Sequence, residues 1–224
     1  MALEVRHSPL SSKRLHRGPY RKASPLAARR GSVVQNLANY CIYRRLLEHF
    51  PSGEERRLYI PTGLSSAQPS EVAHHLAAIA DDVENRYREK FDDMCARIRC
   101  GVSNDAAYAA FSGVASELFG TGTNWGRIAA LFAFARAFAV SLAEKGMREA
   151  VARVSRWLAR FVETNLEEWI AHSGGWETFV TYAKRKRKDL KESSSEKRVS
   201  FGISDVFLLG TVGLGLCASL LAPR

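Results

Sequence analysis

The middle of the chain contains a segment, Ile128 to Ala143, that is apolar or small on every side and carries one charge, Arg136. A helix that is hydrophobic all round must be buried all round. At about 16 residues, the segment is slightly short for crossing a bilayer alone. We therefore expect an all-α fold in which amphipathic helices surround this segment.

Helical patterns account for the sequence on both sides of the apolar segment, and nothing favours strands. The prolines and glycines of residues 51–69 predict a loop. We expect about eight helices, at residues 33–50, 69–91, 91–99, 104–119, 124–145, 148–164, 166–172 and 176–184.

A glycine-rich turn leads into the apolar helix through Asn124, Trp125, Gly126 and Arg127. Asn124 can cap the free amides of the first turn, and Gly126 lets another backbone come close. Arg127 offers a planar fork to a carboxylate, which we expect to be Asp81, about 45 residues upstream.

Asp81 belongs to the predicted helix 69–91, which Ser70 can cap. By periodicity alone an amphipathic core helix is the simpler interpretation, with Ala80 small enough for close helix contact. The apolar stripe consists of Val72, Leu76, Ile79 and Val83. The residues expected on wet faces are Asp81, Asp82, Arg86, Arg88 and Lys90.

A third motif runs from Trp169 to Trp176, where a helix ends at the pair Gly174-Gly175 and Trp176 starts the next. Together the three segments resemble the Bcl-2 family of apoptosis regulators. Residues 76–82 resemble its third homology motif, the death motif, residues 124–127 its first, and residues 169–176 its second. The resemblance covers about residues 33 to 222.

The resemblance implies a Bcl-2-like helical bundle around a central apolar hairpin, and recognition without catalysis. A partner's death-motif helix would lie in a hydrophobic groove while its aspartate pairs with Arg127. The implied death-motif residues are Val72, Leu76, Ile79, Ala80, Asp81 and Val83, the groove residues Val114, Leu118, Asn124, Gly126 and Arg127, and the second-motif residues Trp169, Gly174, Gly175 and Trp176.

Family members act in opposite directions, and the motifs point both ways. Residues 72–91 have a Bak-like texture, which favours a pro-apoptotic effector that homo-oligomerises and permeabilises the mitochondrial outer membrane. Residues 174–180 resemble instead the pro-survival members, which sequester the death-motif helices of other proteins. A tail-anchored adaptor is a third interpretation.

The net charge of +10 is concentrated in two flanks. Residues 1–32 carry +7 and residues 184–198 carry +5, so the remainder is slightly acidic. This distribution argues against a nucleic-acid partner and favours contact with anionic lipids. We expect residues 1–32 to be a disordered basic tail rather than a mitochondrial transit peptide, because prolines interrupt any long amphipathic helix.

The end of the chain, residues 201–222, contains an uncharged run of 17 residues after Asp205. We expect a transmembrane tail anchor behind a basic and polar linker, residues 185–200, with the helical domain, residues 33–184, facing the cytosol. The family suggests the mitochondrial outer membrane, with the endoplasmic reticulum membrane or the cytosol as alternatives. A buried last helix, or a tail folded into the groove, is the other interpretation. The anchor residues are Val206, Phe207, Leu208, Leu209, Leu214, Leu216, Leu220 and Leu221.

Residues with catalytic or metal-binding chemistry do not form a recognisable set. The four cysteines, Cys41, Cys95, Cys100 and Cys217, lack the spacing of a zinc site, and His74 and His75 point to different helix faces. We therefore expect no enzyme activity, no metal and no cofactor. The motif tryptophans are more readily explained by packing at helix junctions than by a ligand cage.

Overall fold

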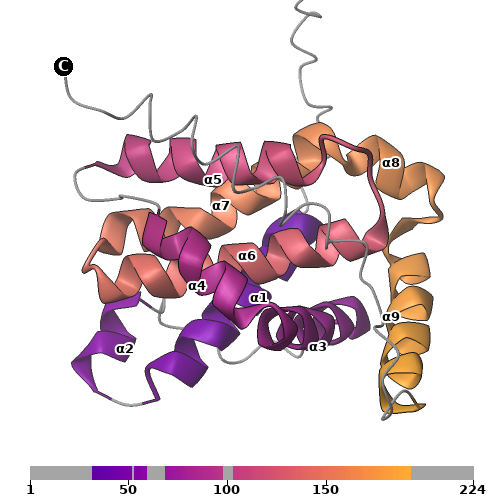
Figure 1. The fold of residues 1–224 in the computed structure, drawn as a ribbon, viewed down its shortest axis with the longest axis horizontal. Helices are drawn as coiled ribbons and strands as arrows, with labels where there is room; N and C mark the ends of the chain where they lie inside the picture. Colours follow the sequence, from indigo (N-terminus) through magenta and orange to yellow (C-terminus); the bar gives the residue numbers. More distant parts are fainter. Residues whose placement is uncertain (1–31, 52, 60–68, 98–102, 193–224) are drawn as a thin grey trace, which may run out of the picture.

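Figure 1 shows the computed structural model, which describes residues 32–51, 53–59, 69–97 and 103–192. This part of the chain is all-α, as predicted, and contains no strand. Its helices are α1 (Val33–His49), α2 (Glu54–Tyr59), α3 (Glu71–Arg86), α4 (Arg88–Arg97), α5 (Asn104–Leu118), α6 (Trp125–Glu144), α7 (Arg148–Asn165), α8 (Glu167–His172) and α9 (Gly175–Glu192).

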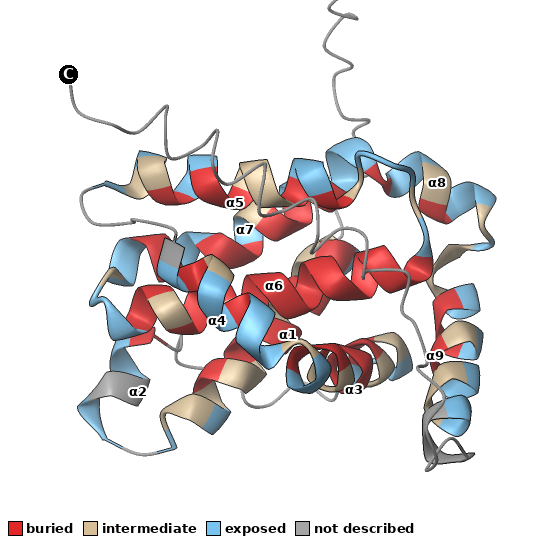
Figure 2. Cartoon of the chain, viewed as in Figure 1, coloured by how far each residue is buried: buried red, intermediate tan, exposed pale blue. Residues whose placement is uncertain are grey.

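Helix α6 is the core of the bundle, as its composition predicts. Every residue from Trp125 to Arg136 is buried, and α1, α3, α4, α5 and α7 all pack against it. Figure 2 shows α6 almost entirely buried, while the surrounding helices keep exposed outer faces. The helix is long and apolar enough to cross a membrane, but 89% of its apolar window is buried inside the bundle.

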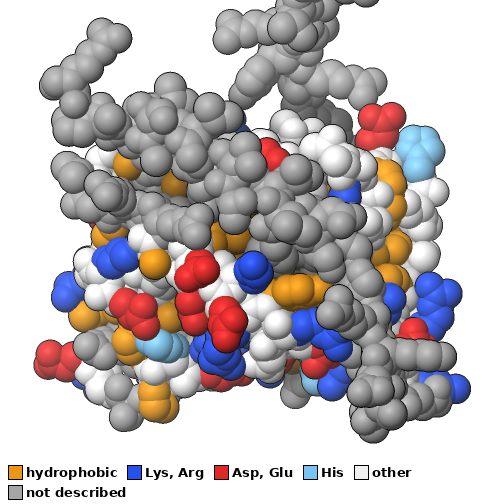
Figure 3. All heavy atoms as spheres, viewed as in Figure 1, with side chains coloured by type: hydrophobic (Ala, Val, Ile, Leu, Met, Phe, Trp, Pro, Cys, Tyr) orange, Lys and Arg blue, Asp and Glu red, His pale blue; other side chains and the backbone are white. Residues whose placement is uncertain are grey.

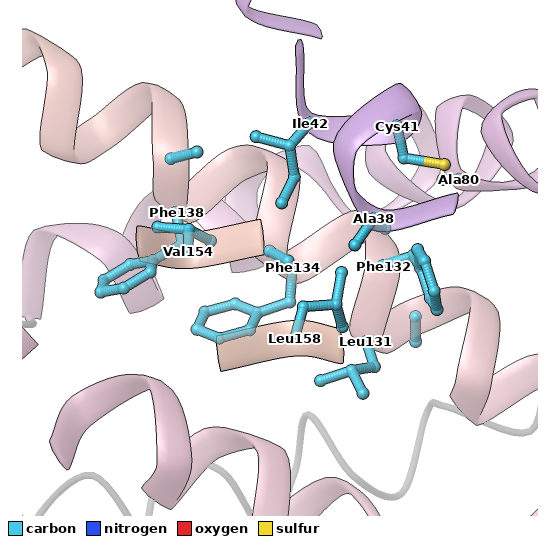
Figure 4. Close-up of a cluster of buried hydrophobic side chains, with 14 of the residues drawn as sticks. Ala38, Cys41, Ile42, Ala80, Leu131, Phe132, Phe134, Phe138, Val154 and Leu158 are labelled. Atoms are coloured by element: carbon cyan, nitrogen blue, oxygen red, sulfur yellow. The ribbon is translucent and has the colours of Figure 1, made fainter. Parts of the chain in front are cut away.

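Aromatic side chains fill the interior where α6 meets α7 and α1. Figure 4 shows Phe134 and Phe138 beside Val154 and Leu158 of α7. The two phenylalanine rings stack with their centroids 5.4 Å apart. Helix α1 also packs against α6, and its buried Ala38 is small enough to allow close helix approach.

Side-chain caps begin the helices where the sequence predicts them. The Ser70 hydroxyl accepts a hydrogen bond from the Ala73 amide at 3.2 Å, and the side-chain oxygen Oδ1 of Asn124 accepts one from the Arg127 amide at 2.9 Å. Such caps contribute about 1 kcal/mol each.

Three boundaries differ from the predictions. Helix α2 lies within the predicted loop, because Tyr59 is buried and its hydroxyl donates to the Ala143 carbonyl at 2.9 Å. The predicted helix 69–91 breaks at Tyr87 into α3 and α4, and α9 continues past residue 184 to Glu192. Residues 1–31 of the predicted basic tail (residues 1–32) and the whole predicted tail anchor (residues 201–222) lie outside the described residues.

Candidate functional site

Arg127 lies at the mouth of α6, and its side chain is nearly buried, with the residue 8% exposed. Its guanidinium donates to the Gly122 carbonyl and to the Thr121 hydroxyl, both 2.5 Å away in the turn that precedes α6. The Nε atom is buried without a hydrogen-bond partner. Within the described part of the chain Arg127 has no carboxylate partner, so the predicted pairing of Arg127 with Asp81 inside one molecule is wrong.

Asp81 pairs instead with Arg136 of α6 and, at 3.0 Å, with Arg44 of α1. Arg136 is 1% exposed and also donates to the Ala77 carbonyl at 3.0 Å. Glu84 lies 3.6 Å from Arg136 and 2.7 Å from Arg45. This set of five charged side chains, the α1–α3–α6 charge network, holds α3 to the core.

The sequence contains a signal for this network in Arg136, the one charge of the apolar segment. A guanidinium in an otherwise apolar buried helix needs a carboxylate, because an unpaired buried charge is very costly. Asp81 was expected on a wet face, yet its side chain is only 28% exposed. Arg127 was therefore the wrong partner for Asp81. The right partner is Arg136, the one charge of the apolar segment.

The remaining death-motif residues face the interior of their own molecule. Leu76, Ile79, Ala80 and Val83 are buried, and Val72 packs at the edge of the core. Helix α3 uses this stripe to pack against α6 and α9. In this conformation the stripe is core, as the simpler interpretation of its periodicity predicts.

The predicted groove residues lie on α5 and at the start of α6. Leu118 and Gly126 are buried, Val114 is half-buried and Asn124 is exposed. Helices α4 and α5 each pack against α6 but barely contact each other. Arg127 lies at the α5 end of this arrangement, because its guanidinium binds the turn that follows α5.

The second-motif residues form an aromatic junction at the start of α6. The Trp125 ring lies 5.0 Å from Trp169 and 6.0 Å from Trp176, measured between centroids. Gly174 and Gly175 have φ values of +88° and +74°, which an ordinary residue adopts only with strain. The glycine pair therefore lets the chain turn between α8 and α9, and the tryptophans pack together as expected.

Helix α9 uses part of its basic end to hold α3. Lys184 pairs with Glu71 at 2.7 Å, and Arg187 with Asp82 at 3.6 Å. The hydrogen bond from Lys184 lowers the pKa of Glu71, whereas burial raises the pKa of Asp82 and lowers that of His75. On the face in Figure 3, acidic and basic side chains are interspersed rather than gathered by sign.

The described residues show neither a reactive thiol at Cys41 nor a metal-binding cluster. Burial raises the pKa of Cys41 to about 12, which keeps its thiol protonated at neutral pH. No three His, Cys, Asp or Glu side chains of the described residues gather as they do around a metal ion.

The comparisons with known proteins agree with this geometry. The family described as "Apoptosis regulator proteins, Bcl-2 family" matches residues 76–176. Apoptosis regulator R11 of Xenopus laevis is 35% identical over 145 residues, which cover 64% of this chain and 69% of that protein. Bcl-2-like protein 1 of Sus scrofa is 33% identical over 161 residues, which cover 69% of this chain and 68% of that protein.

Two solved structures have the same fold. Trichoplax adhaerens trBcl-2L2 bound to trBak BH3 is 29% identical, with a TM-score of 0.55, covering 66% of this chain and 95% of that chain. Chicken BOK has a TM-score of 0.55, and the match covers 66% of this chain and 92% of that chain. At 22% identity, its likeness concerns the fold alone.

Proposed function

Because the chain belongs to the Bcl-2 family of apoptosis regulators, we propose that it binds death-motif helices of other family members in a groove formed by α4, α5 and the start of α6. Family members are regulators and binding proteins, and this chain is therefore not an enzyme. The proposed groove includes Val114, Leu118, Asn124, Gly126 and Arg127.

The observation that carries the proposal is that the nearly buried Arg127 has no carboxylate partner among the residues that the structure describes. Its present partners, the Thr121 hydroxyl and the Gly122 carbonyl, are neutral. An incoming aspartate would replace them with charge-assisted hydrogen bonds, which contribute about 1.5–3 kcal/mol. Burial of four aliphatic anchors would add roughly 6–12 kcal/mol before ordering costs, so submicromolar affinity is within reach.

We favour the pro-survival direction, in which the chain holds the death motifs of others. Its own death motif is occupied, because Asp81 is paired with Arg136 and Arg44. The likeness to Bcl-2-like protein 1 and to trBcl-2L2, which was solved bound to trBak BH3, supports the same direction.

The Bak-like texture of residues 72–91 supports a second candidate function, that of an effector. In that case α3 would leave the bundle, and Leu76, Ile79 and Asp81 would enter the groove of another copy at the mitochondrial outer membrane. In both cases residues 201–222 would anchor the chain, and the basic flanks would contact anionic lipids.

Peptide binding tests the shared part of the proposal. A fluorescent death-motif peptide titrated against the protein should bind with submicromolar affinity, and Arg127→Ala should weaken binding about 10- to 100-fold. A peptide variant with its aspartate replaced by alanine should no longer distinguish Arg127→Ala from the unmodified protein. Equal affinity of both proteins for the original peptide would refute the groove proposal.

Dye release from liposomes of mitochondrial lipid composition decides the direction. The protein without its last 24 residues is tethered to the liposomes, with or without the peptide. Peptide binding without release, together with suppression of release by an added effector, supports the pro-survival function. Peptide-triggered release shows the effector function instead.

A further inference from the structure

A hollow of about 180 Å³ lies between α5 and α7, away from the groove around Arg127. Its aromatic wall includes Tyr108, which is 45% exposed, together with Phe111, Trp157 and Phe161. The Trp157 ring lies 5.5 Å from Tyr108 and 6.2 Å from Phe111, between centroids. The hollow therefore offers a preformed aromatic site about as large as one apolar side chain.

Arg160 lines the same hollow and is exposed. Within the described residues its side chain makes no ion pair and no hydrogen bond, although Arg153, two turns earlier, is 3.6 Å from Glu149. A ligand that complements the hollow therefore combines one apolar side chain with a carboxylate.

Helix α2 presents that combination on another side of the molecule. Leu58 is 42% exposed, and Glu54 lies four residues before it, so the two side chains share one helix face. The neighbouring Tyr59 is fixed by its hydrogen bond to Ala143 and by stacking on Phe50 at 5.5 Å. Leu58 and Glu54 are therefore held on an anchored helix rather than on a free loop.

We propose that α2 of one copy docks into the α5–α7 hollow of a second copy, with Leu58 against the aromatic wall and the Glu54 carboxylate accepting hydrogen bonds from Arg160. Helix α2 and the α5 helix lie on opposite sides of one molecule (Figure 1), so the contact joins different surfaces of the two copies. The contact uses neither Arg127 nor the death-motif helix.

The alternatives on the chain itself complement the hollow less well. Among the described residues outside the hollow, the other strongly exposed apolar residue is Val33, which has Asn36 and Leu37 three and four residues later and so no carboxylate at either position. Residues 1–32 carry a net charge of +7, which would repel Arg160. A contact this small is weak between dilute molecules and gains strength when copies are concentrated on one surface.

Crosslinking between two differently tagged full-length copies on liposomes tests the proposal. Cys100 and Cys217 are replaced by serine in both, while the buried Cys41 and Cys95 are kept. One copy carries Arg57→Cys beside the intact Leu58, and the other carries Ser116→Cys at the hollow. A bis-maleimide should join them at least tenfold more efficiently than it joins Ser116→Cys to a Val33→Cys control.

Charge exchange shows whether the proposed pair forms. Arg160→Glu in the Ser116→Cys copy should reduce crosslinking at least fivefold, and Glu54→Lys in the other copy should restore most of it. Restoration by a second change excludes misfolding as the cause of the loss. Crosslinking no better than the Val33→Cys control, or loss without restoration, would overturn the proposal.

The death-motif peptide separates this proposal from the groove proposal. Arg160→Glu and Glu54→Lys should leave the peptide affinity unchanged within twofold. Arg127→Ala, or a saturating amount of the peptide, should leave the crosslinking yield unchanged within twofold. Crosslinking that the peptide abolishes would assign self-association to the groove and refute the α2 contact.

Discussion

Replacing Asp81 with alanine should destabilise the monomer strongly, because the change leaves Arg136 in the core without its main partner. Arg136 is 1% exposed, and after the change its remaining partners among the described residues are the Ala77 carbonyl at 3.0 Å and the Glu84 carboxylate at 3.6 Å. Removing one partner of a buried ion pair costs about 3–5 kcal/mol. Since the Asp81 side chain is 28% exposed, we expect the lower end, about 3 kcal/mol.

Thermal unfolding of a fragment covering residues 32–192, followed by far-ultraviolet circular dichroism, measures the effect. For a domain of this size about 3 kcal/mol corresponds to a fall in Tm of roughly 6–12 °C. Arg136→Met added to Asp81→Ala should recover about 2 kcal/mol, because an apolar side chain of similar length replaces the stranded charge. Asp81 and Glu84 retain Arg44 and Arg45 in the Arg136→Met single variant, which should therefore be milder than Asp81→Ala.

If Asp81→Ala lowers the free energy of unfolding by less than about 1 kcal/mol, then water or a rearrangement compensates the charge of Arg136. That result would contradict the stabilising role assigned to the charge network. A double variant that is as unstable as the sum of the singles would refute the coupling itself. The result also bears on function. If Asp81→Ala destabilises the fold, its loss of activity would not show whether α3 of one copy enters the groove of another. Arg127→Ala removes no ion pair and is the cleaner probe.

Three further changes test other parts of the structure. Asn124→Ala should cost about 1 kcal/mol in urea denaturation by removing the cap on the Arg127 amide, and an unchanged midpoint would contradict the cap's contribution. Gly174→Ala should lower the free energy of unfolding by about 2 kcal/mol and Gly146→Ala by about 1 kcal/mol. Both glycines have a positive φ, but only at Gly174 would a Cβ meet the Thr178 hydroxyl. Equal Tm values for the two variants would refute the clash. Burial and the charge of Lys184 lower the pKa of His75 in the folded state, so the stability that depends on neutral His75 is lost as pH falls below about 6.5. The His75→Asn protein should therefore lose less Tm than the unmodified protein between about pH 7 and pH 5.

Much of the fold and part of the site follow from local patterns along the chain. The burial of α6 follows from its composition, and the caps at Ser70 and Asn124 follow from hydrogen bonds that reach only three residues. The turn at Gly174 and Gly175 likewise depends on the conformations open to those two residues. Each of these features is determined within one or two helical turns, where sequence and structure correspond directly.

The partners of the charged side chains were decided by the packing of distant helices. The sequence analysis expected Asp81 to pair with Arg127, but the side chain that α6 turns toward α3 is Arg136. The same reason explains α2, whose position depends on a hydrogen bond between Tyr59 and Ala143 across 84 residues of chain.

The sequence by itself thus determined most of the helical segments, where several of them begin, which helix is buried and to which family the chain belongs. Only the tertiary structure decided that Arg127 has no carboxylate partner among the described residues, that Asp81 pairs with Arg136 and Arg44, and that Tyr108 and Arg160 line one hollow. Helical periodicity and capping depend on neighbours in the chain, whereas ion pairs and hollows depend on how helices rotate and cross when they pack.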